Sequence, residues 1–389
     1  MALRILALRI SATLAMVMFM NPFVYGKIVE NRHFCPRDVL LSELCGCIES
    51  GQNSVVYGRR RVGKSSLVLN AGKRFPDRML FLVDLFFTKD AGMFLEYCTN
   101  ALLTFNHSRK GFLEKTMGAL KRIRPNLKFD PDTGIPSFSL DVAQRDEGVL
   151  LNTIDDFFGF LGDEFAADQL VVCFDEFQSV LHYPGADSLL AKIRGKVQYH
   201  PFAYIFTGSD RSGLKKIFTQ PQSPFYKSVR SIEVPVIPQE VFRPFLEEKF
   251  AGGERTVLDE VWNELFELDV PGDIQQLCAA LWESSDQGDM IGVTTLREAC
   301  ERVFSQEIEG FRSLITDLTA LQFRVLKVVA SNGVVNLYSL DSQQAIGASS
   351  SSIRRSMTSL VRKWILVEDQ GLVYFNNPFL KQFLTLHQI

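Results

Sequence analysis

Two stretches of the chain carry residue types that can bind and cleave a nucleoside triphosphate. The first, residues 58–65, fits the pattern G-x-x-x-x-G-K-[ST] in full and lies between an apolar run that predicts a strand and an amphipathic run that predicts a helix. Gly58 and Gly63 allow a backbone that turns its amides toward phosphate oxygens, and a helix starting at Lys64 adds the positive end of its dipole. We therefore expect this loop to bind the phosphates of ATP.

The side chains of this loop have separable expected roles. Lys64 is predicted to reach the β and γ phosphates as a point charge and so to take part in catalysis, and Ser65 is predicted to ligate Mg²⁺ through its hydroxyl. The alternative is that this stretch is only a chance glycine-rich turn between a strand and a helix. The presence of the full motif in that context favours the phosphate-binding loop. The side chains of Arg59 to Arg61 are expected to be exposed or paired with local acids. The predicted nucleotide-contacting residues of the loop are Gly58, Arg59, Arg60, Arg61, Val62, Gly63, Lys64, Ser65 and Ser66.

The second stretch, QLVVCFDEFQ, is a run of apolar residues that ends in two carboxylates. A buried strand would deliver both acids to the carboxyl edge of a sheet, where ligands of open α/β sheets bind. Asp175 is expected to hold Mg²⁺, directly or through water, and Glu176 to act as the general base on the attacking water. The plainer alternatives are a strand-end turn residue for Asp175 and an exposed acid in a first helical turn for Glu176.

A further predicted strand, in FAYIFTGSDRS, ends in polar residues that belong at the same sheet edge. Ser209 or Thr207 is a candidate to sense the γ-phosphate by a hydrogen bond. Arg211 is the nearest cation, but a lone arginine in a loop is more often solvated. We therefore include Ser209 in the predicted site and treat Arg211 as a weak candidate.

Composition places the chain among multidomain globular proteins. It has 389 residues, 46% hydrophobic and 22% charged, with a net charge of −3 that does not suggest a constitutive polyanion binder. The seven cysteines lack the paired C-x-x-C spacing of a zinc site, and a reduced state in the cytosol is expected for Cys45 and Cys47. Mg²⁺ bound with ATP is the only metal expected.

Residues 1–20 form an apolar N-terminal extension that resembles a signal or anchor, with Arg4 and Arg9 before a short apolar run. The run lacks an A-x-A cleavage pattern and is shorter than the roughly 20 residues that span a bilayer. We favour a cytoplasmic protein without stable membrane insertion, with Met18 or Met20 as an alternative start. A membrane-anchored protein stays open as the second interpretation.

Hydrophobic periodicity divides the rest of the chain into three domains. Residues 21–236 predict an α/β domain with a parallel sheet, whose strands are expected at 54–57, 79–85, 170–174, 203–207 and 230–236, with a loop or small hairpin between the second and third. Residues 237–312 carry 17 acidic and 6 basic residues, and their apolar residues fall at helical spacing, as at Leu258, Val261, Trp262 and Leu265. This segment therefore predicts an all-helical, acidic lid.

Residues 313–389 predict a winged helix-turn-helix, with three helices followed by two strands, 365–368 and 372–375, around a turn that contains Gly371. In the third helix Arg354, Arg355, Arg362 and Lys363 are expected to point outward as in a DNA-reading helix, while Ile353, Met357, Leu360 and Trp364 are expected to face the core. The domain carries seven basic and four acidic residues, so its net charge is only +3.

With these motifs placed, the chain resembles the archaeal-type ATPase family of the STAND P-loop NTPases. The resemblance covers nearly everything after Met20 and rests on NPFVYGKIVENRHFCPRDVLLSEL with its F-x-x-R-like element, GRRRVGKSSL, VDLF, VVCFDEFQ, TGSD and PGDIQQLCAALW. It implies an additional strand, bearing Thr207, between the P-loop strand and the Asp175 strand, and it makes Glu176 the base. It also implies an adenine-side contact from the lid at Pro271, although Asp269 stands where the family has Gly.

The leading hypothesis is a slow ATPase that acts as an ATP-driven molecular switch with a protein partner or by self-association. The alternative is a DNA-binding ATPase that uses its C-terminal winged helix, and a third class is a scaffold that binds nucleotide without hydrolysis. We favour a C-terminal domain that packs on the ATPase core or on a protein partner, because a DNA reader is expected to carry a clustered basic face. The net charge of residues 313–389 hardly helps to decide between the two. Glu176 argues against the scaffold.

Overall fold

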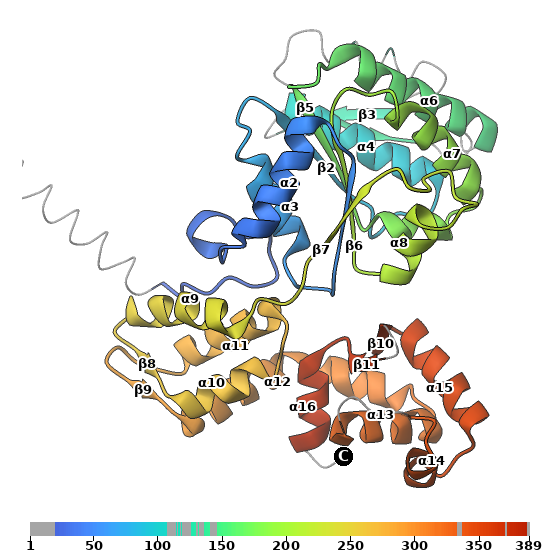
Figure 1. Ribbon diagram of the computed structural model, residues 1–389. Helices are drawn as coiled ribbons and strands as arrows, with labels where there is room; N and C mark the ends of the chain where they lie inside the picture. The colour runs from blue at the N-terminus through green and yellow to red at the C-terminus, as the bar shows by residue number, and fades with distance from the viewer. Residues whose placement is uncertain are drawn as a thin grey trace, which may run out of the picture. The chain divides into compact units, whose positions relative to one another are not determined.

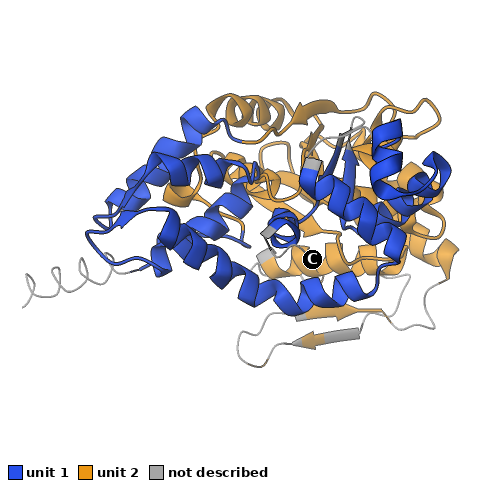
Figure 2. Cartoon of the chain, turned by 90° about the horizontal axis from the view of Figure 1, so that it is seen from below, with its two compact units in different colours: residues 1–27, 237–389 blue, residues 28–236 orange. Residues whose placement is uncertain are grey.

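The computed structural model describes residues 20–106, 126–129, 136–140, 146–332, 337–369 and 372–386, together with positions 114, 116, 118 and 131. The chain divides into two compact units (Figure 2). One is Ile28–Val236, and the other combines Met1–Lys27 with Ile237–Ile389. The predicted N-terminal extension falls almost entirely outside the described residues.

A five-stranded sheet forms the centre of the unit Ile28–Val236. Its strand order is β2-β5-β6-β1-β7, and every neighbouring pair is parallel, as the sequence predicted. The strand β6 lies between β1 and β5, which confirms the expected position of the additional strand. The strand predicted over 230–236 is shorter than expected. The strands are β1 Ser54–Tyr57, β2 Met79–Asp84, β5 Leu170–Asp175, β6 Tyr204–Gly208 and β7 Arg230–Glu233.

Successive residues of β5 enter different hydrophobic cores because side chains of a strand alternate between its two faces. Val171 and Cys173 pack with α2 and α3 on one face, whereas Val172 and Phe174 pack with α4, α6, α7 and α8 on the other (Figure 1). Every residue of β5 is buried, including Asp175 at its carboxyl end. The helices are α2 Asp38–Ser50, α3 Lys64–Gly72, α4 Ala91–Asn106, α6 Glu147–Glu164, α7 Ala186–Val197 and α8 Arg211–Phe218.

The segment between β2 and β5 contains the small hairpin that the Pro, Gly and Asp residues indicated. Its strands β3 (Asn126–Phe129) and β4 (Pro136–Ser139) are antiparallel. Asn100 of α4 fixes β4 through two bonds to Phe138, donating from Nδ2 to its carbonyl oxygen at 2.9 Å and accepting its amide at 2.6 Å. The described residues of this unit also include the short 3-10 helices η1 Asn31–His33 and η3 Phe177–His182.

Residues 237–316 form four helices and one pair of two-residue strands. The strands β8 (Thr256–Val257) and β9 (Met290–Ile291) pair in parallel, so the expectation of an all-helical segment was wrong in this detail. Of the four apolar residues predicted to face the core, Val261, Trp262 and Leu265 are fully buried and Leu258 is partly buried. The last of these helices, α12, continues to Thr316 and so extends past residue 312, where the sequence predicted the end of this domain. The helices are α9 Gln239–Ala251, α10 Asp259–Phe266, α11 Pro271–Glu283 and α12 Val293–Thr316.

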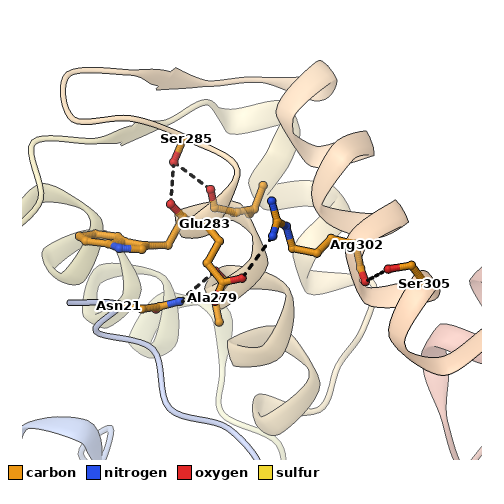
Figure 3. A network of polar contacts seen from close by, with 8 residues as sticks. Asn21, Ala279, Glu283, Ser285, Arg302 and Ser305 are labelled. Atoms are coloured by element: carbon orange, nitrogen blue, oxygen red, sulfur yellow. Dashed lines mark hydrogen bonds and ion pairs between the residues drawn. The ribbon is translucent and has the colours of Figure 1, made fainter. Parts of the chain in front are cut away.

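The chain segment that begins at Met20 packs against these helices. The Phe23 ring lies 4.5 Å from that of Phe250 and 6.2 Å from that of Trp282, centroid to centroid. The Asn21 side chain donates to the carbonyl oxygen of Ala279 at 3.0 Å and to Glu283 at 3.3 Å, next to the Glu283–Arg302 ion pair (Figure 3). This N-terminal segment is therefore part of the helical unit.

Replacing Phe23 by alanine is expected to destabilise the helical unit by about 3 kcal/mol, because the change removes a buried aromatic ring and leaves a cavity. Phe23 is only 5% exposed. The measurement is thermal or urea unfolding of the full chain. Met290→Ala is the matched control, since Met290 belongs to the same unit and is 69% exposed. Equal stability of the Phe23 variant and the control would contradict the packing of this segment.

Three helices and an antiparallel hairpin follow in the expected order, and a further helix, α16, was not predicted. Phe383 of α16 packs against Phe304 and Phe311 of α12, with ring centroids 6.1 and 5.4 Å apart. The elements are α13 Ala320–Asn332, α14 Leu340–Ile346, α15 Ser350–Arg362, β10 Leu366–Asp369, β11 Leu372–Phe375 and α16 Pro378–Leu386.

The expectation that Trp364 faces the core was wrong. The helix α15 ends at Arg362, and Trp364 takes a positive φ of 57°, so it leaves the helical register and is 50% exposed. The core position goes to Ile365, which is 3% exposed. The other three apolar residues named for this helix, Ile353, Met357 and Leu360, are buried as predicted.

None of the helices among the described residues is long and apolar enough to cross a membrane. The anchor interpretation concerns residues 1–19, which lie outside the part of the chain that the structure describes.

Candidate nucleotide-binding site

The loop between β1 and α3 needs glycine at both ends of its motif. A side chain at Gly58 would bring its Cβ within 2.4 Å of the carbonyl oxygen of Val234, which is backbone and cannot move aside cheaply. Gly63 has a φ of 96°, a conformation that L-residues with a side chain rarely adopt. The two glycines thus let the chain turn sharply into α3, whose first residue is Lys64.

Lys64 is buried against the loop. Its Nζ donates to the carbonyl oxygens of Gly58 at 3.2 Å and Arg59 at 3.1 Å, and the residue is 5% exposed. Burial lowers the pKa of Lys64, and the negative charges of Glu176 and Asp175 partly oppose that shift. A desolvated ammonium beside two carboxylates is a suitable partner for phosphate oxygens, because electrostatic attraction is stronger where water is excluded.

Asp175, the last residue of β5, accepts hydrogen bonds from hydroxyl groups on two other elements. Its Oδ2 accepts a 2.5 Å hydrogen bond from Ser65 of α3, and its Oδ1 accepts one from Thr207 of β6. Asp175 is 9% exposed, and its Oδ1 also accepts a hydrogen bond from the amide of Glu176 at 3.0 Å. Carboxylate and hydroxyl oxygens are the hard ligands that Mg²⁺ prefers, so Ser65 and Asp175 fit the predicted metal site.

Glu176 follows β5 in a left-handed conformation with a φ of 53°, which turns its side chain toward β6. Its Oε2 accepts three hydrogen bonds, from the Ser209 hydroxyl at 2.8 Å, the Ser209 amide at 3.2 Å and Nε2 of Gln178 at 2.5 Å. Ser209 therefore contacts the predicted base, while its role as a γ-phosphate sensor stays a prediction. A non-glycine residue at positive φ carries strain, which often accompanies functional sites.

Sequence analysis missed two polar residues of this edge. Gln178 is buried, and Cβ atoms at Gly208 and Gly213 would lie 2.0 and 2.9 Å from its side chain, so both glycines make room for it. Asp84 ends β2 directly beside Asp175 in the register of the sheet. Partial desolvation raises the pKa of Asp84, and the charge of Asp175 acts in the same direction. The signals in the sequence were the Gln in DEFQ and the Asp in VDLF.

The arginines near the site have local partners. Arg211 pairs with Glu233 at 2.8 Å and lies over the Tyr57 ring at 5.1 Å, which agrees with its weak standing as a catalytic cation. The Arg60 guanidinium lies 4.7 Å from the ring centroid of Phe86, just after β2. Lys64, which is buried against the loop, therefore remains the cation that we expect to bind phosphate.

Pro271 belongs to the other compact unit, so its predicted contact with adenine stays a prediction. It is the first residue of α11 and is buried. Asp269, which stands where the resembled motif has Gly, adopts a positive φ of 60°. The backbone at this position therefore has the conformation that glycine favours, in spite of the substitution.

Comparison with known proteins places the fold. No family model and no curated protein matches the chain. Among solved structures, it is similar to the Walker-type ATPase PABY2304 of Pyrococcus abyssi, with a TM-score of 0.59 and 19% identity over 94% of this chain and 100% of that one. It is also similar to the Aeropyrum pernix ORC1 protein in complex with DNA, with a TM-score of 0.50 and 11% identity over 91% and 93%. The parallel sheet, its phosphate-loop motif and these similarities define a P-loop NTPase fold.

Proposed function

We propose that this chain is a Mg·ATP-binding P-loop ATPase that acts as an ATP-driven molecular switch. The observation that carries the proposal is the meeting of Lys64, Ser65, Asp175 and Glu176 at the carboxyl edge of one parallel sheet. These four residues come from two stretches more than a hundred positions apart in the sequence, and each has the chemistry that phosphoryl transfer to water requires.

In this proposal each residue has one task. Lys64 and the backbone amides at the start of α3 bind the phosphates, and Ser65 and Asp175 hold Mg²⁺, which neutralises phosphate charge when bound. Glu176 takes the proton of the attacking water. Because its Oε2 accepts the bonds from Ser209 and Gln178, we assign the proton transfer to its Oε1.

The second compact unit would transmit the switch. Residues 237–312 would act as a lid that senses nucleotide, and residues 313–389 would act as a winged helix that contacts a protein partner or a second copy. The order of three helices and a hairpin supports the winged-helix interpretation. We also propose, from the sequence patterns, that the chain belongs to the STAND group and that it is located in the cytoplasm.

The direct test is Mg·ATP binding by calorimetry together with phosphate release by the full chain. Binding with measurable release that requires Mg²⁺ is the expected result. Binding without release would favour the nucleotide-binding scaffold, and failure to bind would reject the ATP site altogether. Each alternative therefore has its own outcome.

DNA binding is the second candidate function because α15 presents basic residues to solvent. Arg354, Arg355, Arg362 and Lys363 are all exposed, and the exposed Trp364 follows them directly. The ORC1 neighbour was solved in complex with DNA. Against this, residues 237–312 carry a net charge of −11, which repels phosphates within a Debye length of about 8 to 10 Å.

We expect the full chain to bind duplex DNA weakly or not at all at physiological salt, because the basic face is small. The measurement is a salt titration of duplex binding with and without ATP. The test variant replaces Arg354, Arg355, Arg362 and Lys363 by alanine, and the control replaces Arg324, Lys327 and Lys381, which lie on α13 and α16. Submicromolar binding that only the test variant abolishes, with a salt slope of about −0.9 per neutralised phosphate, would establish the DNA-binding function instead.

A further inference from the structure

A buried arginine touches both the phosphate-binding loop and the segment that leaves the sheet unit. Arg37 precedes the first residue of α2 and is only 9% exposed. One terminal nitrogen of its guanidinium, Nη2, donates to the carbonyl oxygen of Val62 at 2.7 Å, and the other, Nη1, donates to that of Pro235 at 2.7 Å. Burial lowers its pKa to about 10, so it remains charged at neutral pH.

The bond to Val62 fixes one peptide of the phosphate loop. In a trans peptide the carbonyl and the following amide point in opposite directions, and the described residues contain no cis peptide. With the Val62 oxygen held toward Arg37, the amide of Gly63 points away from it. A phosphate that accepts this amide would lie on the far side of the peptide from the guanidinium, so Arg37 would orient the loop without touching the nucleotide.

The bond to Pro235 reaches the connection to the other unit. Pro235 lies two positions before Ile237, where the second unit begins. The preceding residue, Val234, donates its amide to the Tyr57 carbonyl at 2.7 Å, and its own carbonyl oxygen occupies the space beside Gly58. Residues 234–235 therefore contact the start of the phosphate loop directly and its end through Arg37.

We propose that Arg37 is a positioning residue that sets the phosphate-binding conformation of the loop and links that conformation to residues 234–236. The proposal rests on the ATP site proposed above and adds a route by which its occupancy reaches the second unit. A phosphate that shifts the Val62–Gly63 peptide changes the geometry at Nη2, and the rigid guanidinium passes the change to the Pro235 carbonyl through Nη1.

The test compares Arg37→Ala and Arg37→Lys with Arg78→Ala. Arg78 is a matched control because it also donates a 2.7 Å bond to a backbone carbonyl, that of Ile48, in the same unit but away from the phosphate loop. We expect Arg37→Ala to bind Mg·ATP about tenfold more weakly, the loss of a charge-assisted bond, and Arg37→Lys to fall between it and the wild type. Arg78→Ala should bind as the wild type does.

Hydrogen exchange distinguishes positioning from general stability. Saturating Mg·ATP should slow exchange in a peptide covering residues 230–243 of the wild type and of Arg78→Ala, and this response should be lost in Arg37→Ala at matched saturation. If Arg37→Ala does not fold, the lysine variant decides by the same two readouts. If an Arg37 variant keeps the wild-type affinity and the wild-type exchange response, the role inferred for Arg37 is wrong, and the proposed ATP site is unaffected. If the wild-type chain does not bind ATP, the proposed function itself is rejected.

Discussion

Glu176→Gln is expected to bind Mg·ATP as tightly as the wild type and to hydrolyse it at least about a hundredfold more slowly, the usual contribution of a general base. The amide keeps the shape of the carboxylate, and its oxygen can still accept the bonds from Ser209 and Gln178. It lacks the basicity to take a proton from water. Calorimetry for binding and single-turnover phosphate release for the chemical step measure the two effects separately.

Glu233→Gln is the matched control for this change. Glu233 ends β7 at the same carboxyl edge of the sheet, and its carboxylate pairs with Arg211. This variant should keep the wild-type rate. Wild-type turnover in Glu176→Gln would assign the base to another residue, and Asp84, which lies beside Asp175 in the sheet, would be the first to test.

The sequence predicted β1, β2, β5 and β6 well because these strands are short apolar runs that end in recognisable motifs, whereas β7 is largely polar and shorter than predicted. The phosphate loop and the Asp175–Glu176 pair are local patterns, and the parallel topology brings the carboxyl ends of their strands to one edge. The residues of these motifs could therefore be assigned to the nucleotide site from the sequence alone.

The residues that were missed depend on contacts between distant parts of the chain. Gln178 gains its role from the space that Gly208 and Gly213 leave, and Arg37 gains its role from carbonyls 25 and 198 positions away. An F-x-x-R-like pattern cannot show which carbonyls the arginine will meet. The Trp364 error has a local cause, because the helical periodicity was extended beyond the residue where α15 ends.

The N-terminal segment shows the same limit of sequence patterns. Residues 21–27 precede the sheet unit in the chain and were assigned to its domain, yet they cluster with the helical unit. Phe23 carries this contact through its packing with Phe250 and Trp282, and neither partner is near it in sequence. A periodic pattern identifies helices and strands, whereas a single apolar anchor in an irregular segment carries no periodicity to detect.

Lys64→Ala is expected to weaken Mg·ATP binding about a hundredfold, because it removes charge-assisted bonds to phosphate from a site that excludes water. Its effect on stability should be small. The buried ammonium loses hydration on folding, and its two bonds to loop carbonyls at 3.1 and 3.2 Å only offset that cost. A loss of affinity without a fall in melting temperature would thus report the nucleotide contact itself.

Lys73→Ala provides the control for Lys64→Ala. Lys73 directly follows α3, and its partly exposed ion pair with Glu30 lies outside the phosphate loop. Such surface pairs contribute little to stability, so this variant should match the wild type in both affinity and melting temperature. If Lys64→Ala bound Mg·ATP as well as Lys73→Ala does, the ammonium would have no role in phosphate binding. The loop from Gly58 to Ser65 would then be a structural turn, and the ATPase proposal would lose its foundation.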